Sequence, residues 1–167
     1  MSFNIHIGEA VVDKHYAEEE ADEYGTELKV AVHSLELEGA PVFRGDSMTG
    51  NSNSRYPGYL QWDEAVRAMT LHDLFFKKDT GIMSQHPGCF LLTKKHANKI
   101  RRALNFYKVN HPDAKPGWCD CDECAKPIKG DGLPHEDLDG VLARLIWLDF
   151  WVHWALENCK IPAIYNS

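Results

Sequence analysis

The sequence lacks long hydrophobic runs and is short of basic residues. Its uninterrupted apolar segments, such as residues 145–148, fall far below the roughly 20 residues that a membrane-spanning helix needs. No apolar stretch of a secretory signal follows the start methionine, so we expect a cytoplasmic protein with no membrane partner. Lys and Arg number 18 against 25 Asp and Glu, and the net charge of −7 argues against general nucleic-acid binding.

Cysteine is scarce, and its number is odd, which excludes a framework in which every cysteine is paired within the chain. In a reducing compartment the five cysteines are expected to be thiols or metal ligands. Cys119, Cys121 and Cys124 have the spacing of thiolates that turn toward one zinc ion, and either His135 or His111 could be the fourth ligand. We predict a structural zinc site of Cys119, Cys121, Cys124 and His135, with free thiols on a loop as the alternative.

Apolar and aromatic residues are abundant enough for one folded domain over residues 1–167. The composition is 44% apolar, with five Trp, seven Phe and six Tyr, which excludes a disordered chain. Local composition divides the domain into a strand-rich part, a polar loop, a helical part, a cysteine-containing loop, and a central helix with a docked tail. These segments are residues 1–43, 44–61, 62–110, 111–136 and 137–167.

The hydrophobic periodicity predicts an α+β fold. Apolar and polar residues alternate over residues 3–7 and 28–32, so we expect a small antiparallel sheet from the N-terminal third. Apolar spacings of three and four residues predict three helices, over residues 63–77, 94–109 and 138–158. The last of these is apolar over more than half of its surface, so we expect it to be central, with the sheet packed on the helices.

The polar loop is the best candidate for ligand contact. Residues 44–59 combine arginines that can grip a phosphate with neutral hydrogen-bond donors and aromatic rings on which a base can stack. Residues 94–108 carry six Lys or Arg and no acid, which adds positive potential or neutralises the chain's own acids. A flexible polar loop is the alternative, because the spacing of a Walker or dinucleotide motif is missing. The candidate ligand-binding residues are Arg44, Ser47, Asn51, Asn53, Arg55, Tyr56, Tyr59, Trp62, Arg101 and Arg102.

Polar residues on the central helix are a second candidate cluster. Asp149, His153 and Glu157 are four residues apart and therefore form one stripe. Such a stripe can be a carboxylate–imidazole relay, half of a metal site, or a set of helix-stabilising pairs, which we favour. Cys89 lies three residues after His86, but a cysteine nucleophile also needs an orienting third group. We predict no catalytic residue and favour a protein that is not an enzyme.

Five phrases of the sequence are distinctive. They are Arg55-Tyr56-Pro57-Gly58-Tyr59, His86-Pro87-Gly88-Cys89, residues 142–148, residues 154–159 and residues 162–167. These phrases resemble those of a group of small tailed-phage proteins over residues 55–167, although the segment from Cys119 to Cys124 departs from the group's shorter linker. The resemblance brings no activity with it. It implies an accessory protein in the host cytoplasm that counters host defence, as some such proteins do by sequestering nucleotide signals.

We therefore expect a protein that sequesters a small phosphate-bearing, nucleotide-like signal without turnover. Two other functions stay open, as does the oligomeric state. The acidic residues 18–23 and the acidic segment 111–157 fit an inhibitor that binds a host defence enzyme through an acidic surface. Asp149 and His153 fit a metal-dependent hydrolase or nuclease.

Overall fold

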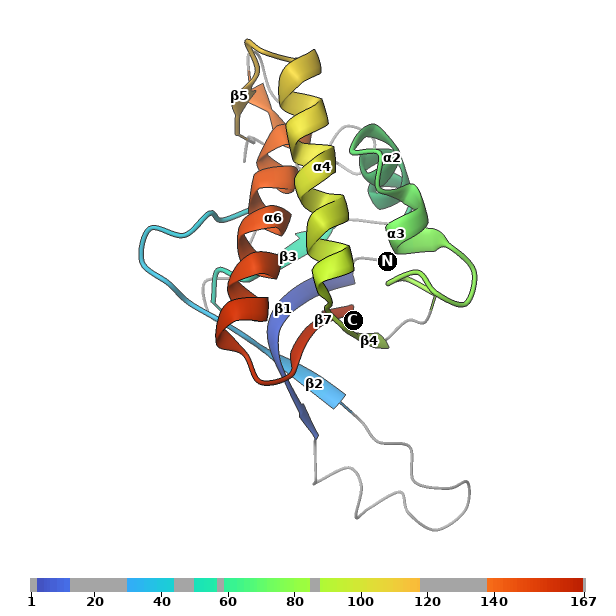
Figure 1. Cartoon of the computed structure of the whole chain (residues 1–167), viewed down its shortest axis with the longest axis vertical. Coiled ribbons are helices and arrows are strands. Elements are labelled where there is room, and N and C mark those ends of the chain that lie inside the picture. Colours follow the sequence, from blue (N-terminus) through green and yellow to red (C-terminus); the bar gives the residue numbers. More distant parts are fainter. Residues whose placement is uncertain are drawn as a thin grey trace.

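An antiparallel sheet of five strands draws its strands from both ends and the middle of the chain (Figure 1). The computed structural model describes residues 3–12, 30–43, 50–56, 59–84, 88–117 and 138–166. Within them the strands of this sheet are β1 (Phe3–Val12), β2 (Val30–Ser34), β3 (Asn53–Tyr56), β4 (Gly88–Leu91) and β7 (Pro162–Asn166).

The long strand β1 organises the sheet. β2 pairs with its C-terminal half and β3 with its N-terminal end, so these two strands lie end to end along one edge of β1. β7 pairs with the other edge, and β4 follows beyond β7. The alternation at the start of β1 has the expected consequence, because Ile5 and Ile7 are fully buried.

In the described residues four helices pack with this sheet, and two of them are long. The helices are α2 (Tyr59–Ala68), α3 (His72–Phe76), α4 (Lys94–Asn110) and α6 (Gly140–Asn158). α4 and α6 lie side by side and run antiparallel, since Arg101 contacts Asp149 while Tyr107 contacts Asp139 (Figure 1). A short parallel pair closes the far end of these helices and consists of β5 (Lys115–Pro116) and β6 (Leu138–Asp139).

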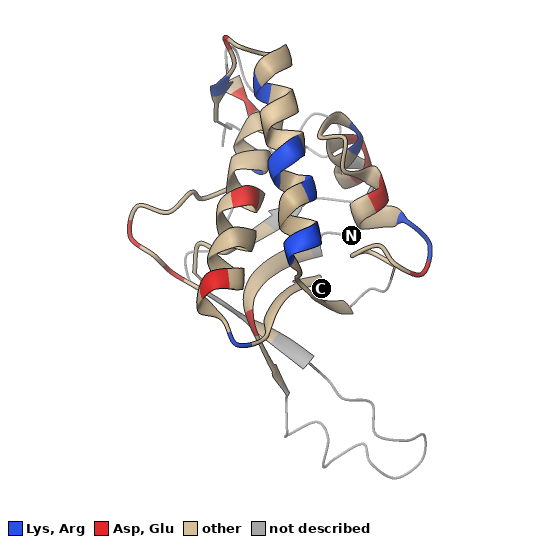
Figure 2. Ribbon diagram, in the orientation of Figure 1, with Lys and Arg blue, Asp and Glu red and all other residues tan. Residues whose placement is uncertain are grey.

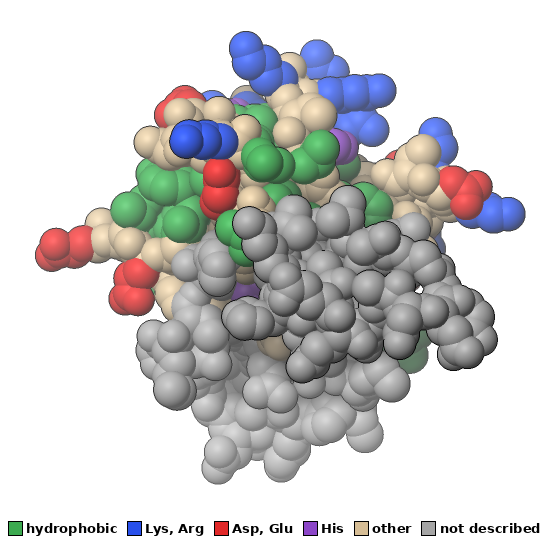
Figure 3. Space-filling model, turned by 90° about the horizontal axis from the view of Figure 1, so that it is seen from below, with side chains coloured by type: hydrophobic (Ala, Val, Ile, Leu, Met, Phe, Trp, Pro, Cys, Tyr) green, Lys and Arg blue, Asp and Glu red, His purple; other side chains and the backbone are tan. Residues whose placement is uncertain are grey.

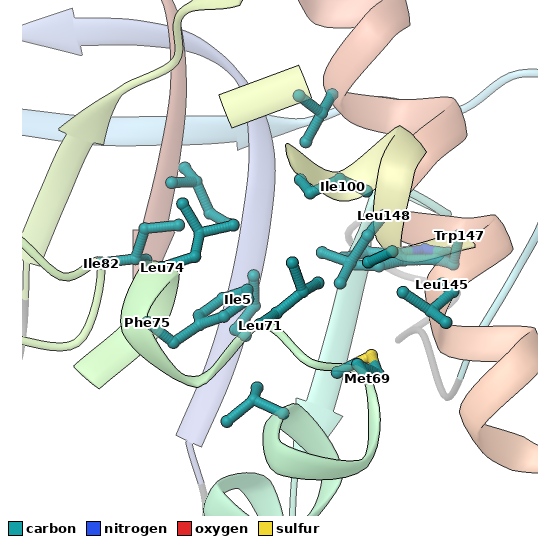
Figure 4. Packing of buried hydrophobic residues seen from close by; sticks show 14 of the residues in the cluster. Ile5, Met69, Leu71, Leu74, Phe75, Ile82, Ile100, Leu145, Trp147 and Leu148 are labelled. Carbon is teal, nitrogen blue, oxygen red and sulfur yellow. The ribbon is translucent and has the colours of Figure 1, made fainter. Parts of the chain in front are cut away.

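The core lies between the sheet and the helices, and its largest side chains are tryptophans. Trp62, Trp147 and Trp151 are fully buried. Side chains from β1, α3, α4 and α6 meet in this core, with Leu71 and Ile100 among them (Figure 4). Burial of these large apolar side chains in one cluster is the main contribution to the stability of the fold.

The α+β class and the antiparallel sheet are confirmed, and the helices expected at 94–109 and 138–158 are found nearly to the residue. Two differences concern the sheet. Strands β4 and β7 come from outside the N-terminal third to which we assigned it, and β3 lies in residues 44–61, which we predicted to be a polar loop. The tail that we expected to dock on the body is instead an interior strand, because β7 pairs on both edges.

The single helix expected over 63–77 is wrong, because the chain turns after α2 and starts again as α3. Thr70 has φ of 58°, in the left-handed region. Leu71 N–H donates to the Val66 carbonyl at 2.8 Å, and Thr70 N–H donates to the Arg67 carbonyl at 3.0 Å. These two bonds are the Schellman pattern that ends a helix, with threonine at the position where glycine is usual.

None of the helices in the described ranges is both long enough and apolar enough to cross a membrane.

Candidate functional site

The predicted ligand-binding residues of the polar loop are not gathered into one site by the described residues. Arg44 and Ser47 lie outside these residues. Arg55 and Tyr56 are in β3, opposite Asn4 and Phe3 of β1. Tyr59 is the first residue of α2.

Asn51 and Asn53 have structural roles. The Asn51 side chain accepts from Leu37 N–H at 3.2 Å and donates to the Leu37 carbonyl at 2.8 Å, so it bridges two loop segments. Asn53 is buried in β3. Gly50 has φ of 91°, and a Cβ there would lie 2.6 Å from the Leu35 carbonyl oxygen. The Asn51 amide group, which suggested ligand contact, therefore holds the loop against the preceding chain.

Trp62 belongs to the core and presents no ring face to solvent. Its side chain is fully buried, and its ring meets Phe75 edge-on with centroids 4.9 Å apart. Since stacking of a base needs an accessible ring face, we reassign Trp62 from the ligand site to the core.

Arg101 and Arg102 point to different surroundings although they are adjacent. Arg101 Nε donates to Asp149 Oδ1 at 2.7 Å across the α4–α6 interface. His153 Nδ1 lies 2.7 Å from the Asp149 backbone oxygen and 3.3 Å from its Oδ1. Two members of the predicted stripe thus contact each other and Arg101 at the α4–α6 interface, while Glu157 is exposed. Arg102 lines a concave surface between α4 and the start of α3.

That concave surface is a groove of about 340 Å³ between α4 and the turn that leads into α3. We call it the α3–α4 groove. Its polar lining consists of Thr70, Asp73, Lys99 and Arg102. Its apolar lining consists of Leu71, Leu74, Ala103 and Phe106.

The floor of the α3–α4 groove is rigid because it is also part of the core. Leu71, Leu74 and Ala103 are buried and belong to the main hydrophobic cluster, in which Figure 4 shows Leu71 and Leu74. Phe106, by contrast, is 60% exposed. The groove therefore offers a fixed apolar base with one accessible aromatic ring at its side.

Positive charge dominates the α4 wall of the groove. Figure 2 shows Lys and Arg at successive turns of α4, and Figure 3 shows Lys and Arg side chains projecting from one rim of the molecule. Lys99 and Arg102 are three residues apart, so they share one face of the helix. Both are exposed, and within the described part of the chain neither has an ion-pair or hydrogen-bond partner.

The pKa of His96 reflects this charge. Burial lowers the pKa of His96, and the positive charges of Lys99 and Lys95 lower it further. The protonated imidazole is thus disfavoured partly because the neighbouring ammonium groups already make this region positive. An anion at the α4 wall would meet uncompensated charge.

A polar cluster supports the opposite wall. Asp63 Oδ2 accepts from Arg67 Nε at 2.8 Å, and Asp63 Oδ1 lies 3.0 Å from His72 Nε2. The hydrogen bond from Arg67 is the main reason that the pKa of Asp63 is lowered. These contacts connect α2 to the first residue of α3 across the turn at Thr70, so they fix the position of the groove wall.

The sequence signal for this site was present but incomplete. Lys99, Arg102 and Phe106 have helical spacing, which places an aromatic residue on the basic face of a predicted helix. Thr70 and Asp73 gave no signal, because both were assigned to the interior of one continuous helix. The concavity depends on the turn that the periodicity did not reveal.

The predicted zinc ligands Cys119, Cys121, Cys124 and His135 lie outside the described residues. His111, the alternative ligand, stacks on Tyr107 with ring centroids 4.1 Å apart. Within the described ranges no three His, Cys, Asp or Glu side chains are arranged to hold a metal ion. Cys89 is half-buried, and burial raises the pKa of its thiol, which disfavours the thiolate form.

Comparisons with family models, with curated proteins and with solved structures found no match to this chain.

Proposed function

We propose that the protein binds a small phosphate-bearing, nucleotide-like ligand in the α3–α4 groove and sequesters it without turnover. The observation that carries the proposal is the pairing of two accessible cations, Lys99 and Arg102, with an apolar floor and the exposed ring of Phe106. In this arrangement the cations form charge-assisted hydrogen bonds to the phosphate, and the base stacks on the ring.

The cations suit a phosphate in complementary ways. The Arg102 guanidinium can donate two parallel hydrogen bonds to phosphate oxygens, whereas the Lys99 ammonium acts as a mobile point charge. Arg101 is hydrogen-bonded to Asp149, so we assign phosphate binding to Arg102 and not to Arg101. Because both groove cations are exposed, we expect ligand affinity to fall as salt is added.

The volume of the groove indicates the size of the ligand. Small-molecule sites span roughly 300–1,000 Å³, so a groove of about 340 Å³ lies at the lower end. A single mononucleotide fits this range better than a dinucleotide. Sequestration of such a signal is consistent with the anti-defence role implied by the resemblance to phage proteins.

Calorimetry on the full chain with inorganic phosphate and with linear and cyclic nucleoside monophosphates tests this proposal. We expect at least one nucleotide to bind, and the Arg102→Ala and Lys99→Ala variants to bind it about tenfold more weakly. The matched control is Lys108→Ala, an exposed base of the same helix that does not line the groove. Absence of binding across the panel, or equal losses in all three variants, would refute the proposal.

Recovery of the ligand separates sequestration from hydrolysis. The complex is incubated, heat-denatured, and its small-molecule fraction is analysed by chromatography. Intact nucleotide supports sequestration, and a stoichiometric excess of product would show that the protein is an enzyme.

A further inference from the structure

We propose that the α3–α4 groove selects guanine nucleotides, and that Asp73 is the residue that reads the base. This inference rests on the proposed function, since it assumes that a nucleotide occupies the groove. It starts from a feature that phosphate binding leaves unexplained, namely an acidic side chain in the lining of an anion site.

Asp73 is the one acid among the described residues that line the groove. Its side chain is 87% exposed, and the one ion-pair contact that it makes among the described residues is to His72 Nδ1, 3.9 Å from Oδ1 and beyond hydrogen-bond distance. A free carboxylate near Lys99 and Arg102 repels phosphate and would weaken a site built for phosphate alone. The carboxylate contributes to binding only when the ligand also presents hydrogen-bond donors.

Guanine has the edge that matches a carboxylate. Its N1–H and its N2 amino group are two neighbouring donors, and the two oxygens of Asp73 are acceptors at a similar separation. On adenine and cytosine a ring nitrogen acceptor stands beside the amino group, and on uracil two carbonyls flank the single N–H. Each of these bases sets an acceptor against one oxygen of the carboxylate, so only guanine satisfies both oxygens.

The turn beside Asp73 supplies a second polar group. Thr70 lines the same wall and holds a left-handed backbone conformation that glycine would adopt without strain. A threonine at such a position costs stability, and strain of this kind is concentrated at functional sites. Its hydroxyl can donate to a base acceptor such as O6 of guanine.

Competition calorimetry on the full chain with GMP, IMP, AMP and UMP tests the selection. We expect GMP to bind at least tenfold more tightly than AMP or UMP, roughly the lower end of what a bidentate base contact contributes. IMP retains N1–H but lacks the amino group, so we expect an intermediate affinity. Equal affinity for GMP and AMP would overturn the selection.

Asp73→Asn keeps the shape of the side chain but removes its negative charge, so the test compares the affinities of different nucleotides within one variant. Asparagine presents one acceptor and one donor, which match N1–H and the carbonyl O2 of xanthine. We therefore expect Asp73→Asn to lose the preference for GMP over AMP and to raise the affinity for XMP relative to that for GMP, a ratio that loss of the carboxylate's repulsion alone would leave unchanged. The control is Glu64→Gln, an exposed acid of α2 outside the groove lining, which should change neither ratio of affinities.

The outcomes keep the two proposals apart. If the nucleotides bind equally and Asp73→Asn raises the affinity for all of them, phosphate binding stands and base selection is wrong. If no nucleotide binds, or if Arg102→Ala leaves every affinity unchanged, the proposed function itself is wrong. If Asp73→Asn fails to raise the affinity for XMP relative to that for GMP while Arg102→Ala weakens GMP binding, then Asp73 does not read the base.

Discussion

Arg101 and Asp149 join the middle of α4 to the middle of α6 through a hydrogen-bonded ion pair of 2.7 Å. The Asp149 side chain is only 12% exposed, whereas that of Arg101 is 49% exposed. The pair therefore satisfies a carboxylate that would otherwise be largely buried without a strong partner. Arg102, the next residue, lines the α3–α4 groove instead, so one of two adjacent arginines has a structural contact and the other belongs to the candidate site.

Substitution of the two arginines by alanine should separate these roles. Arg101→Ala should lower the free energy of unfolding by about 1 kcal/mol, since the pair is partly solvent-screened, and should leave nucleotide affinity within about twofold. Arg102→Ala should leave stability unchanged and weaken binding about tenfold. Urea unfolding and calorimetry on both variants measure this. The reverse pattern would mean that the two assignments are exchanged.

Thr70 is the position where we expect a stabilising change. Thr70→Gly should raise the free energy of unfolding by about 0.5–1 kcal/mol, because relief of the left-handed strain exceeds the entropy that glycine adds to the unfolded chain. Thr80→Gly, at an exposed turn residue, has no positive φ to relieve and should be neutral or destabilising. Thermal unfolding of both variants tests the difference. A loss of stability in Thr70→Gly would show that the threonine makes contacts that outweigh its strain.

The same substitution also bears on function. Because Thr70→Gly removes a hydroxyl from the groove wall, it should weaken nucleotide binding even as it stabilises the fold. A more stable variant with unchanged affinity would place the hydroxyl outside the binding contacts.

The helices α4 and α6 were predictable because their apolar spacing is local and persists over four or more turns. The break at Thr70 was not, because the Schellman turn there uses threonine where the usual glycine signal is missing. Strand β7 was missed for another reason. Its residues do not alternate between apolar and polar, and its two partners, β1 and β4, are far away in the sequence.

The candidate site shows that residue types alone do not determine which side chains contact a ligand. Asn51 and Trp62 are residue types that often contact ligands. In this protein the Asn51 amide instead holds a loop through Leu37, and the Trp62 ring is buried in the core. Arg102, which lines the groove, could be proposed as a candidate from the sequence because basic charge on a helix face is visible there. Asp73 could not be, since the groove depends on how α3 packs against α4.

The N-terminal cap of α4 should make stability depend on pH. Thr93 N–H donates to His96 Nδ1 at 3.1 Å, which requires the neutral imidazole. The pKa of His96 is lower in the folded protein than its ordinary value of 6.5, so the unfolded chain takes up the proton first. Stability should therefore decrease as the pH falls from 7.5 through about 6.5 and below.

His96→Gln isolates this contribution. Glutamine keeps an acceptor for Thr93 N–H but does not titrate, so the Tm of this variant should fall less between pH 7.5 and 5.5 than that of the wild-type chain. Some slope should persist, because burial also lowers the pKa of His6. His96→Ala should lose about 1 kcal/mol at pH 7.5 through the missing cap. Parallel pH curves for wild type and His96→Gln would exclude the cap as the source.

Two isoleucines near the C-terminus test the interior position of β7. Ile164 is 1% exposed and pairs with Ile7 of β1 and Phe90 of β4, whereas Ile161, just before the strand, is 50% exposed. Ile164→Ala should cost about 2–4 kcal/mol, because it removes buried methyl groups and leaves a cavity in the core. Ile161→Ala deletes the same atoms from a half-exposed site and should cost less than about 1 kcal/mol. Similar urea midpoints for the two variants would mean that the tail only rests on the surface, as a docked segment, and that the sheet does not depend on it.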